Sequence, residues 1–393
     1  MTPLQRIAAR WYVYGYLREV VLIFPVYAIM MGEHGVSPIQ LSILFIVWSV
    51  SALVFEVPSG VLADRYSRKR LLVIAGSVKG CAFIIWWLSP DFAGYLIGFI
   101  VWGFGSSLSS GTSESFLYDT LYAQREQAAF ARIYGRGSAA NSLGIATALA
   151  GGGYLAEYGY TLPLLLSTAA PWSSALVAAI AFVEPPRSGS VSYETTHANY
   201  WKTLAAGLNE VRKSRIVQRI VVMSATLVTA YGVTEEYIGP FLREAPKLSL
   251  GTVGVVYAAA FATRTLGMEI AHRLPFRSLR AIAWLFALGT LGLAATVVAN
   301  GTWLIVTLGG YFAMSSAAQV LMQTRLQHEI DGAARATVTS IAKMAENTGG
   351  LLFIVYIGGI AQLWSFQIAL AAVAALTFAL AIAFAAIAPA RDR

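Results

Sequence analysis

The chain has 393 residues, of which 57% are hydrophobic and 12% are charged. The charged share is about half of the roughly 25% that is typical of globular proteins, so a water-soluble domain would lack the charged surface it needs. The abundance of Leu, Ile, Val and aromatic residues excludes an intrinsically disordered chain. A single cysteine, Cys81, excludes a disulfide scaffold and a cysteine-based zinc site. The composition therefore indicates a membrane protein with several spans.

Apolar stretches of about 20 residues, the length that a helix needs to cross a bilayer, recur along the chain. The predicted transmembrane helices, in chain order, are 11–31, 39–63, 71–89, 93–118, 132–156, 162–183, 216–241, 250–272, 279–298, 302–326, 335–361 and 364–388. Their near-continuous spacing favours helices over the alternating strands of a barrel. We therefore predict an all-α membrane protein with twelve transmembrane helices, and no cleavable signal peptide is expected.

The basic residues predict the orientation of these spans. With the amino terminus in the cytoplasm, 22 of the 28 Lys and Arg residues fall on the inner side, and only Arg243 and Lys247 fall in outer loops. This asymmetry follows the positive-inside rule. It predicts a protein of a bacterial-type inner (plasma) membrane with both termini in the cytoplasm. The net charge of +8 then reflects topology and contact with anionic membrane lipids, so no nucleic-acid partner is expected.

The longest polar stretch, from Glu184 to Arg215, has the Pro- and Ser-rich composition of a linker. It divides the chain into an N-terminal six-helix bundle (1–183), a cytoplasmic linker (184–215) and a C-terminal six-helix bundle (216–393). A comparison of the two halves reveals an internal repeat. A shift of 206 residues aligns Asn141 and Gly144 with Asn347 and Gly350 in predicted spans 5 and 11, and a shift of 205 aligns Glu114 with Gln319. Because the offsets are nearly equal in two pairs of spans, we expect two pseudo-symmetric bundles that arose by duplication.

The inner loop between predicted spans 2 and 3 carries a specific motif. Residues 60–70 read Gly-Val-Leu-Ala-Asp-Arg-Tyr-Ser-Arg-Lys-Arg. This segment, called here the signature loop, resembles the signature of the major facilitator superfamily, with Ser67 where that pattern has Gly. Together with twelve predicted spans and a central linker, the resemblance covers the whole chain. It implies the major facilitator fold and secondary transport of a small molecule by alternating access.

The resemblance also implies gating roles for Gly60, Asp64, Arg65 and Arg68. Gly60 permits close approach of helices. In the family, the aspartate at the position of Asp64 holds the two halves in the outward-open state, and the start of span 11, near Arg335, is its expected partner. Arg65 and Arg68 are expected to join that charge network. These residues are interpreted as gating residues and not as substrate ligands.

Predicted span 5 is similar to the antiporter motif of this superfamily. Gly135, Gly144, Gly152 and Gly153 fall in frame, but Ala148 and Leu149 replace the Gly-Pro pair that is diagnostic of export. The span 4 arginine of proton-coupled members is also missing, since 99–119 contains no Arg. Proton coupling must therefore rest on other groups or be absent.

Ionisable residues inside predicted spans are costly, so each calls for an explanation. Arg18 and Glu19 lie midway along span 1, which lines the central cavity in the family, and they are the leading cavity residues. The alternative is a purely structural role. Glu56 and Lys79 lie at similar depth on spans 2 and 3, and we expect them to form a buried structural ion pair; alternatively, Glu56 faces the cavity or the gate.

Predicted span 4 has one polar face, formed by Ser110, Glu114 and Tyr118 at intervals of four residues. Arg136 at the start of span 5 is a candidate partner for Glu114. A carboxylate in such a cavity suits a proton carrier or a substrate contact.

Five further ionisable residues complete the candidate set for substrate binding or proton coupling: Glu235, Glu236, Arg264, Lys343 and Glu346. Adjacent helical residues diverge by about 100°, so only one of Glu235 and Glu236 can point squarely into a cavity. Lys343 and Glu346, spaced i, i+3, are positioned to neutralise each other. If they do not, the mixture of signs suits a charged or zwitterionic substrate.

The sequence contains no nucleotide-binding loop, no zinc-protease motif and no nucleophile elbow. We therefore expect no enzyme, no catalytic residues, no cofactor and no metal site. The first hypothesis is proton-coupled export of a drug or metabolite by a monomer whose partners are its substrate, protons and lipid. The second is proton-coupled uptake of a charged or zwitterionic metabolite.

Overall fold

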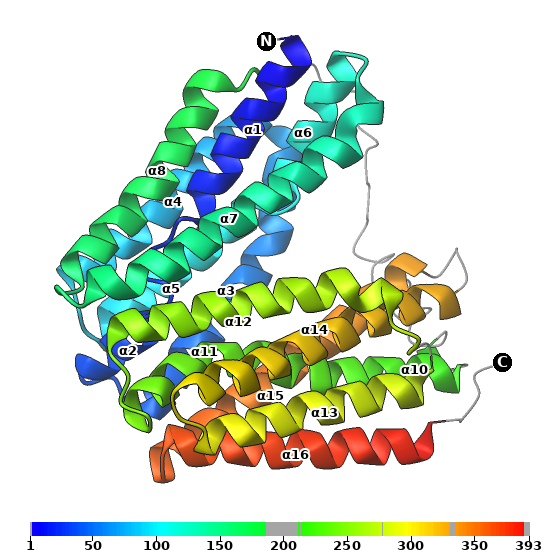
Figure 1. Cartoon of the computed structure of the whole chain (residues 1–393). Coiled ribbons are helices and arrows are strands. Elements are labelled where there is room, and N and C mark those ends of the chain that lie inside the picture. Colours follow the sequence, from blue (N-terminus) through cyan, green and yellow to red (C-terminus); the bar gives the residue numbers. More distant parts are fainter. Residues whose placement is uncertain (1, 186–210, 213, 277, 331–334, 389–393) are drawn as a thin grey trace. The chain divides into compact units, whose positions relative to one another are not determined.

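The computed structural model describes residues 2–185, 211–212, 214–276, 278–330 and 335–388. The side chains of Val57, Asp64 and 335–337 lie outside this description, as does most of the predicted linker 184–215. All regular elements of the described residues are helical (Figure 1). The chain divides into unit 1, made of Met1–Ser192 and Leu248–Tyr257, and unit 2, made of Tyr193–Lys247 and Ala258–Arg393.

The helices of unit 1 are α1 (Pro3–Glu19), α2 (Tyr27–Glu33), α3 (Pro38–Arg65), α4 (Arg68–Leu88), α5 (Phe92–Ser109), α6 (Thr112–Ala123), the short η1 (Gln127–Ala129), α7 (Phe130–Ala156) and α8 (Thr161–Ala181). Those that follow are α10 (Arg215–Met223), the π-helical η2 (Ser224–Val228), α11 (Thr229–Glu244), α12 (Leu250–Ile270), the short η3 (Ala271–Arg273), α13 (Leu279–Val298), α14 (Thr302–Glu329), α15 (Arg335–Leu363) and α16 (Phe366–Ile387). They belong to unit 2, apart from the start of α12, which groups with unit 1.

Nine helical segments of the described chain are long and apolar enough to cross a membrane: Pro38–Glu56, Arg68–Leu88, Phe92–Ala123, Thr161–Ala181, Arg215–Glu244, Leu279–Val298, Thr302–Glu329, Val338–Leu363 and Phe366–Ile387. The predicted spans 11–31, 132–156 and 250–272 are not among them. The fold class is confirmed as a helical membrane protein, and the count of twelve stays a prediction.

Two predicted spans, 11–31 and 93–118, are broken by residues outside any helix, and both breaks lie beside ionisable residues. The first helix ends at Glu19, and no α-helix follows until α2 begins at Tyr27. The second interruption separates α5 from α6 at Gly111, whose φ of +65° is a conformation that glycine adopts without steric cost. As a result Glu19 stands at a helix end and Glu114 stands in the first turn of α6.

The same order of packing recurs in the two units. In unit 1, α4 packs on α5 and α8, and α1 packs on α7 and α8; in unit 2, α13 packs on α14 and α16, and η2 and α11 pack on α15 and α16. Glycines permit the closest of these contacts. A Cβ atom on Gly144 of α7 would collide with the Tyr16 carbonyl of α1, and one on Gly349 of α15 would collide with the Ala225 carbonyl of η2. This repeated arrangement is what a duplication would produce.

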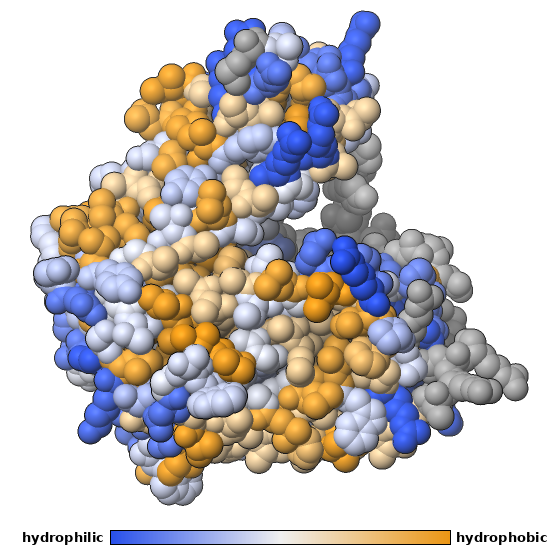
Figure 2. Space-filling model, in the orientation of Figure 1, coloured by the Kyte–Doolittle hydropathy of each residue, from blue (hydrophilic) through white to orange (hydrophobic). Residues whose placement is uncertain are grey.

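Large apolar side chains remain exposed on the outer helices, as Figure 2 shows in orange. On α8 they are Leu162, Leu165, Leu166, Trp172, Leu176 and Ile180. An apolar face of this kind suits contact with lipid tails rather than with water.

Candidate functional site

The end of α1 carries the first charged cluster, called here the unit 1 cluster: Arg18, Glu19 and Lys79. Arg18 Nε lies 2.9 Å from Glu19 Oε1, and Lys79 Nζ from α4 lies 3.7 Å from Glu19 Oε2. Lys79 Nζ also donates a hydrogen bond of 3.0 Å to the Arg18 carbonyl oxygen. Because the last carbonyls of a helix have no partner within it, the Lys79 ammonium stabilises the end of α1. The three side chains are only 11–24% exposed.

This arrangement shows that the prediction of an ion pair between Glu56 and Lys79 was wrong. Lys79 is 9% exposed and contacts Glu19, whereas Glu56 is exposed. The reason lies in how α3 is rotated. Its neighbouring residue Phe55 packs edge-on against Phe104 of α5, at 4.9 Å between ring centroids. Adjacent helical residues diverge by about 100°, so Glu56 lies on another face of α3 than this contact.

Asn141 of α7 connects the unit 1 cluster to its surroundings. With the amide oriented so that both of its atoms are bonded, the Asn141 nitrogen donates to the carbonyls of Gly15 (3.1 Å) and Gly137 (3.2 Å). The Asn141 oxygen accepts a bond of 3.1 Å from Arg18 Nη2. The arginine is therefore held by a carboxylate and an amide, and its guanidinium also lies 5.8 Å from the Tyr14 ring centroid.

Glu114 lines a cavity of unit 1 that is also lined by Arg18 and Asn141. Tyr134 of α7 donates a hydrogen bond of 2.5 Å to Glu114 Oε1. Arg136, the expected partner, is exposed and makes no ion pair with Glu114 in the described part of the chain. The cavity, of about 80 Å³, is lined by Trp11, Tyr14, Gly15, Arg18, Ser113, Glu114, Tyr134, Gly137, Ser138 and Asn141. Tyr118 is directed elsewhere: it is 45% exposed and stacks on Tyr122.

Unit 2 carries a second cluster, made of Glu235, Arg264 and Tyr231 and called here the unit 2 cluster. Arg264 Nη1 of α12 lies 2.6 Å from Glu235 Oε2 of α11. The Arg264 guanidinium lies 5.7 Å from the centroid of the Tyr231 ring, and Tyr231 packs edge-on against Tyr311 at 5.8 Å and against Phe312 at 5.5 Å. Glu235 therefore forms an ion pair with Arg264, and its neighbour Glu236 is half-buried.

Several buried polar atoms of unit 2 lack a hydrogen-bond partner among the described residues. They are Tyr231 Oη, Ser315 Oγ and Gln319 Oε1. Buried polar groups are normally bonded, so unbonded ones are candidates for contact with water or a ligand. The π-helical η2 ends shortly before Tyr231, and such interruptions are common at functional sites. Tyr231, Ser315 and Gln319 were not among the principal candidates predicted from the sequence.

The predicted pair of Lys343 and Glu346 is present on α15, with Lys343 Nζ 3.1 Å from Glu346 Oε2. The Lys343 side chain is 71% exposed and that of Glu346 is 12% exposed. The pair thus neutralises most of the charge that this helix would otherwise present.

The signature loop is held by two acids that were not predicted from the sequence. Arg68 forms an ion pair with Asp119 of α6 and donates to the Ser115 carbonyl at 3.3 Å. Glu184, just beyond α8, accepts hydrogen bonds of 2.9 Å from the backbone N–H groups of Arg68 and Lys69. A carboxylate at this position caps the amino terminus of α4, where the helix dipole favours an anion.

The remaining gating residues contribute less to the described structure. Arg65 is exposed, and the side chain of Asp64 lies outside the described residues, as does that of its expected neighbour Arg335. A Cβ atom on Gly60 would meet no described atom within 4 Å, so the described helices of unit 1 make no close approach there.

Known proteins share both the sequence pattern and the fold. The sequence profile of the Major Facilitator Superfamily matches residues 16–354. The chain belongs to this superfamily. The resemblance of the signature loop is thereby confirmed.

One curated relative is the uncharacterized MFS-type transporter YxaM of Bacillus subtilis (strain 168). It is 27% identical over 232 residues, which are 56% of this chain and 54% of YxaM. The chain thus spans about half the length of the curated relative it matches.

Solved structures of superfamily members share the fold over nearly the whole chain. The nucleoside transporter NupG superposes with a TM-score of 0.78 at 13% identity, covering 98% of this chain and 99% of NupG. A D-xylose-proton symporter gives a TM-score of 0.69 at 12% identity and covers 96% of this chain and 98% of its own. The matched proteins are transporters rather than enzymes, as expected for this chain. Among the described residues, no three His, Cys, Asp or Glu side chains gather as a metal site would require.

Proposed function

We propose that this superfamily member is a secondary active transporter that moves a small molecule by alternating access, driven by protons. The observation that carries the proposal is the Glu235–Arg264 ion pair of 2.6 Å on two helices of the apolar unit 2. Ionisable residues within membrane-spanning segments are expensive to keep and mark substrate or ion pathways. A carboxylate in contact with a cation can exchange that contact for a proton, which couples protonation to the conformation of the helices that carry the pair.

The two clusters differ in how well they suit the role of proton carrier. Protonation of Glu19 would leave two cations, Arg18 and Lys79, without their carboxylate, whereas protonation of Glu235 would break its ion pair with Arg264. We therefore assign proton coupling to Glu235. Glu114, which accepts a hydrogen bond from Tyr134, is the second candidate for this role.

Export of a drug or metabolite by proton antiport is the first candidate, because glycines of α7 match the glycine positions of the superfamily's antiporter motif. Gly144 makes the close helix contact that such a pattern permits. The substrate is assigned to the buried unit 2 atoms that lack a partner among the described residues, such as Tyr231 Oη.

Proton-coupled uptake of a charged or zwitterionic metabolite is the second candidate. Two observations favour it. Ala148 and Leu149 replace the Gly-Pro pair of exporters, and the unit 1 cluster holds two cations for one carboxylate, which favours an anionic group of a substrate. One structural relative is itself named a proton symporter.

Proteoliposomes with an imposed pH gradient test both candidates. A ligand-stabilisation screen of the purified protein first identifies a binding compound, since bound ligand raises apparent stability. Antiport predicts that this compound accumulates inside vesicles whose interior is acidic. Symport predicts accumulation when the exterior is acidic. Equal uptake with and without a gradient, in protein that binds the compound, would contradict proton coupling in either direction.

A further inference from the structure

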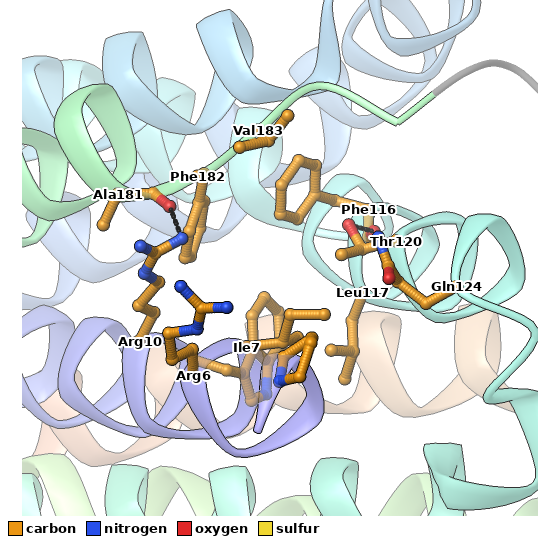
Figure 3. Close-up of a pocket in the computed structure, with 12 residues that line it drawn as sticks. Arg6, Ile7, Arg10, Phe116, Leu117, Thr120, Gln124, Ala181, Phe182 and Val183 are labelled. Atoms are coloured by element: carbon orange, nitrogen blue, oxygen red, sulfur yellow. Dashed lines mark hydrogen bonds between the residues drawn. The ribbon is translucent and has the colours of Figure 1, made fainter. Parts of the chain in front are cut away.

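A second cavity in unit 1 lies nearer to the start of α1 than the candidate site. It has a volume of about 210 Å³ and is lined by residues of α1, of α6 and of the segment around the end of α8. Figure 3 shows Arg6 and Arg10 projecting from α1, opposite Thr120 and Gln124 of α6, with Phe182 and Val183 beside them. All of its lining residues belong to unit 1.

The rim of this cavity is cationic. Arg6 and Arg10 are one helical turn apart, and Arg10 Nη1 donates a hydrogen bond of 2.7 Å to the Ala181 carbonyl. Neither arginine forms an ion pair with a carboxylate in the described part of the chain. Like charges at this spacing repel each other. An anion between them would relieve the repulsion, and the guanidinium fork matches the oxygens of a phosphate group.

The floor of the cavity is apolar and aromatic. Phe182 stacks on Phe116 with 4.8 Å between ring centroids and on Trp11 with 6.2 Å. The three residues are only 2–8% exposed. A free inorganic anion would gain from the arginines alone. A molecule with an anionic head and an apolar body would gain from the arginines and from the floor.

We propose that this cavity binds an anionic phospholipid. Arg6 and Arg10 hold its phosphate, and the upper part of one acyl chain lies against Trp11, Phe116 and Phe182. The distribution of positive charge predicts that the start of α1 faces the cytoplasm, where the membrane surface is anionic. Trp11 suits this depth, because tryptophan is enriched at membrane interfaces. The bound lipid would tie α1 to α6 and to the end of α8.

Native mass spectrometry of the detergent-purified protein tests the site without measuring transport, so its outcome is independent of the proposed function. Phosphatidylglycerol is titrated into wild type and into Arg6→Gln, a variant that leaves the Arg10–Ala181 bond in place. We expect the variant to bind phosphatidylglycerol about tenfold more weakly, because it loses one charge-assisted hydrogen bond to the lipid phosphate. Arg132→Gln, which removes an exposed arginine from the first turn of α7, is the matched control and leaves binding unchanged.

Phosphatidylcholine and inorganic phosphate distinguish the proposed ligand from its alternatives. We expect both to bind more weakly than phosphatidylglycerol, because phosphatidylcholine carries no net negative charge and inorganic phosphate has no acyl chain to lie against the apolar floor. Phosphatidylcholine binding as tight as that of phosphatidylglycerol would indicate an ordinary lipid contact. Inorganic phosphate binding as tight as that of phosphatidylglycerol would indicate a site for a free anion. Either result overturns the proposal. So does unchanged phosphatidylglycerol binding in Arg6→Gln. If that variant does not fold, Arg6→Lys, which keeps the charge but loses the fork, replaces it, and unchanged affinity again overturns the proposal.

Discussion

The two units each hold an ion-paired cluster, but they balance its charges differently. In unit 1 Glu19 lies beside two cations, Arg18 and Lys79. In unit 2 one carboxylate, that of Glu235, contacts one cation, Arg264. A cluster with excess cations attracts anions and keeps its carboxylate charged. In a cluster with one carboxylate and one contacting arginine, protonation of the carboxylate breaks a single ion pair, here Glu235–Arg264.

The surrounding polar atoms show the same contrast. In unit 1 the Asn141 amide and the Tyr134 hydroxyl both make hydrogen bonds. In unit 2 the Tyr231 hydroxyl and the Gln319 amide oxygen are buried without a partner among the described residues. Among the described residues, the polar atoms around the unit 1 cluster are therefore hydrogen-bonded, whereas the Tyr231 hydroxyl of the unit 2 cluster is not. The bonded atoms favour rigidity, and the unbonded hydroxyl favours ligand binding.

The largest expected effect comes from breaking the unit 1 cluster. Glu19→Gln leaves Arg18 and Lys79 without a carboxylate, so we expect a loss of about 3 kcal/mol in the free energy of unfolding, the lower end for a broken buried pair. Thermal unfolding in detergent measures it. Glu126→Gln, at an exposed carboxylate, is the control and should unfold as wild type does. The double variant Glu19→Gln/Lys79→Met should recover part of the lost free energy of unfolding. A Glu19→Gln protein as stable as the control would show that the cluster does not stabilise unit 1.

A smaller effect is expected at the two asparagines that the internal repeat aligns. Asn141→Ala removes hydrogen bonds to Gly15, Gly137 and Arg18, which we expect to cost about 1–2 kcal/mol. Asn347 is exposed, so Asn347→Ala should change the free energy of unfolding by less than about 0.5 kcal/mol. Equal losses in the two variants, measured by the same thermal unfolding, would contradict the contrast between the units.

The smallest effect is expected from removing one hydroxyl group. Tyr134→Phe loses the hydrogen bond to Glu114 and should cost about 1 kcal/mol of stability. Tyr231→Phe loses no hydrogen bond to a described residue and should stay within about 0.5 kcal/mol of wild type. Tyr158→Phe, at a side chain that is 91% exposed, provides the reference for a neutral change. A greater loss in Tyr231→Phe than in Tyr134→Phe would show that the Tyr231 hydroxyl has a partner in the folded protein.

Hydropathy predicts the position of most spans because the length of an apolar stretch can be read directly from the sequence. The predicted spans 71–89 and 279–298 correspond closely to α4 and α13. The interruption at Gly111 was not predicted, because a single glycine in an apolar helix does not reveal whether the chain turns there. The superfamily was predicted correctly from residues 60–70, since a motif with fixed spacing is specific even where single residues are not.

Pairing between spans is harder to predict than their positions. A helix that is apolar on most faces gives no indication of its rotation, and for that reason Glu56 was assigned to Lys79. Arg68 contacts Asp119, 51 residues away, and Glu184, 116 residues away. No local pattern links residues at such distances. The pair Lys343–Glu346 was accessible from sequence, because an i, i+3 spacing on a helix brings the two side chains together.

The central claim is that Glu235 carries the proton, and the variant Glu235→Gln tests it most directly. In proteoliposomes, substrate exchange without a gradient needs no net proton movement, whereas accumulation driven by a pH gradient does. We expect Glu235→Gln to retain exchange and to lose gradient-driven accumulation to the level of protein-free vesicles. Glu269→Gln, at an exposed glutamate near the end of α12, should retain both. Gradient-driven accumulation at the wild-type level in Glu235→Gln would contradict the claim.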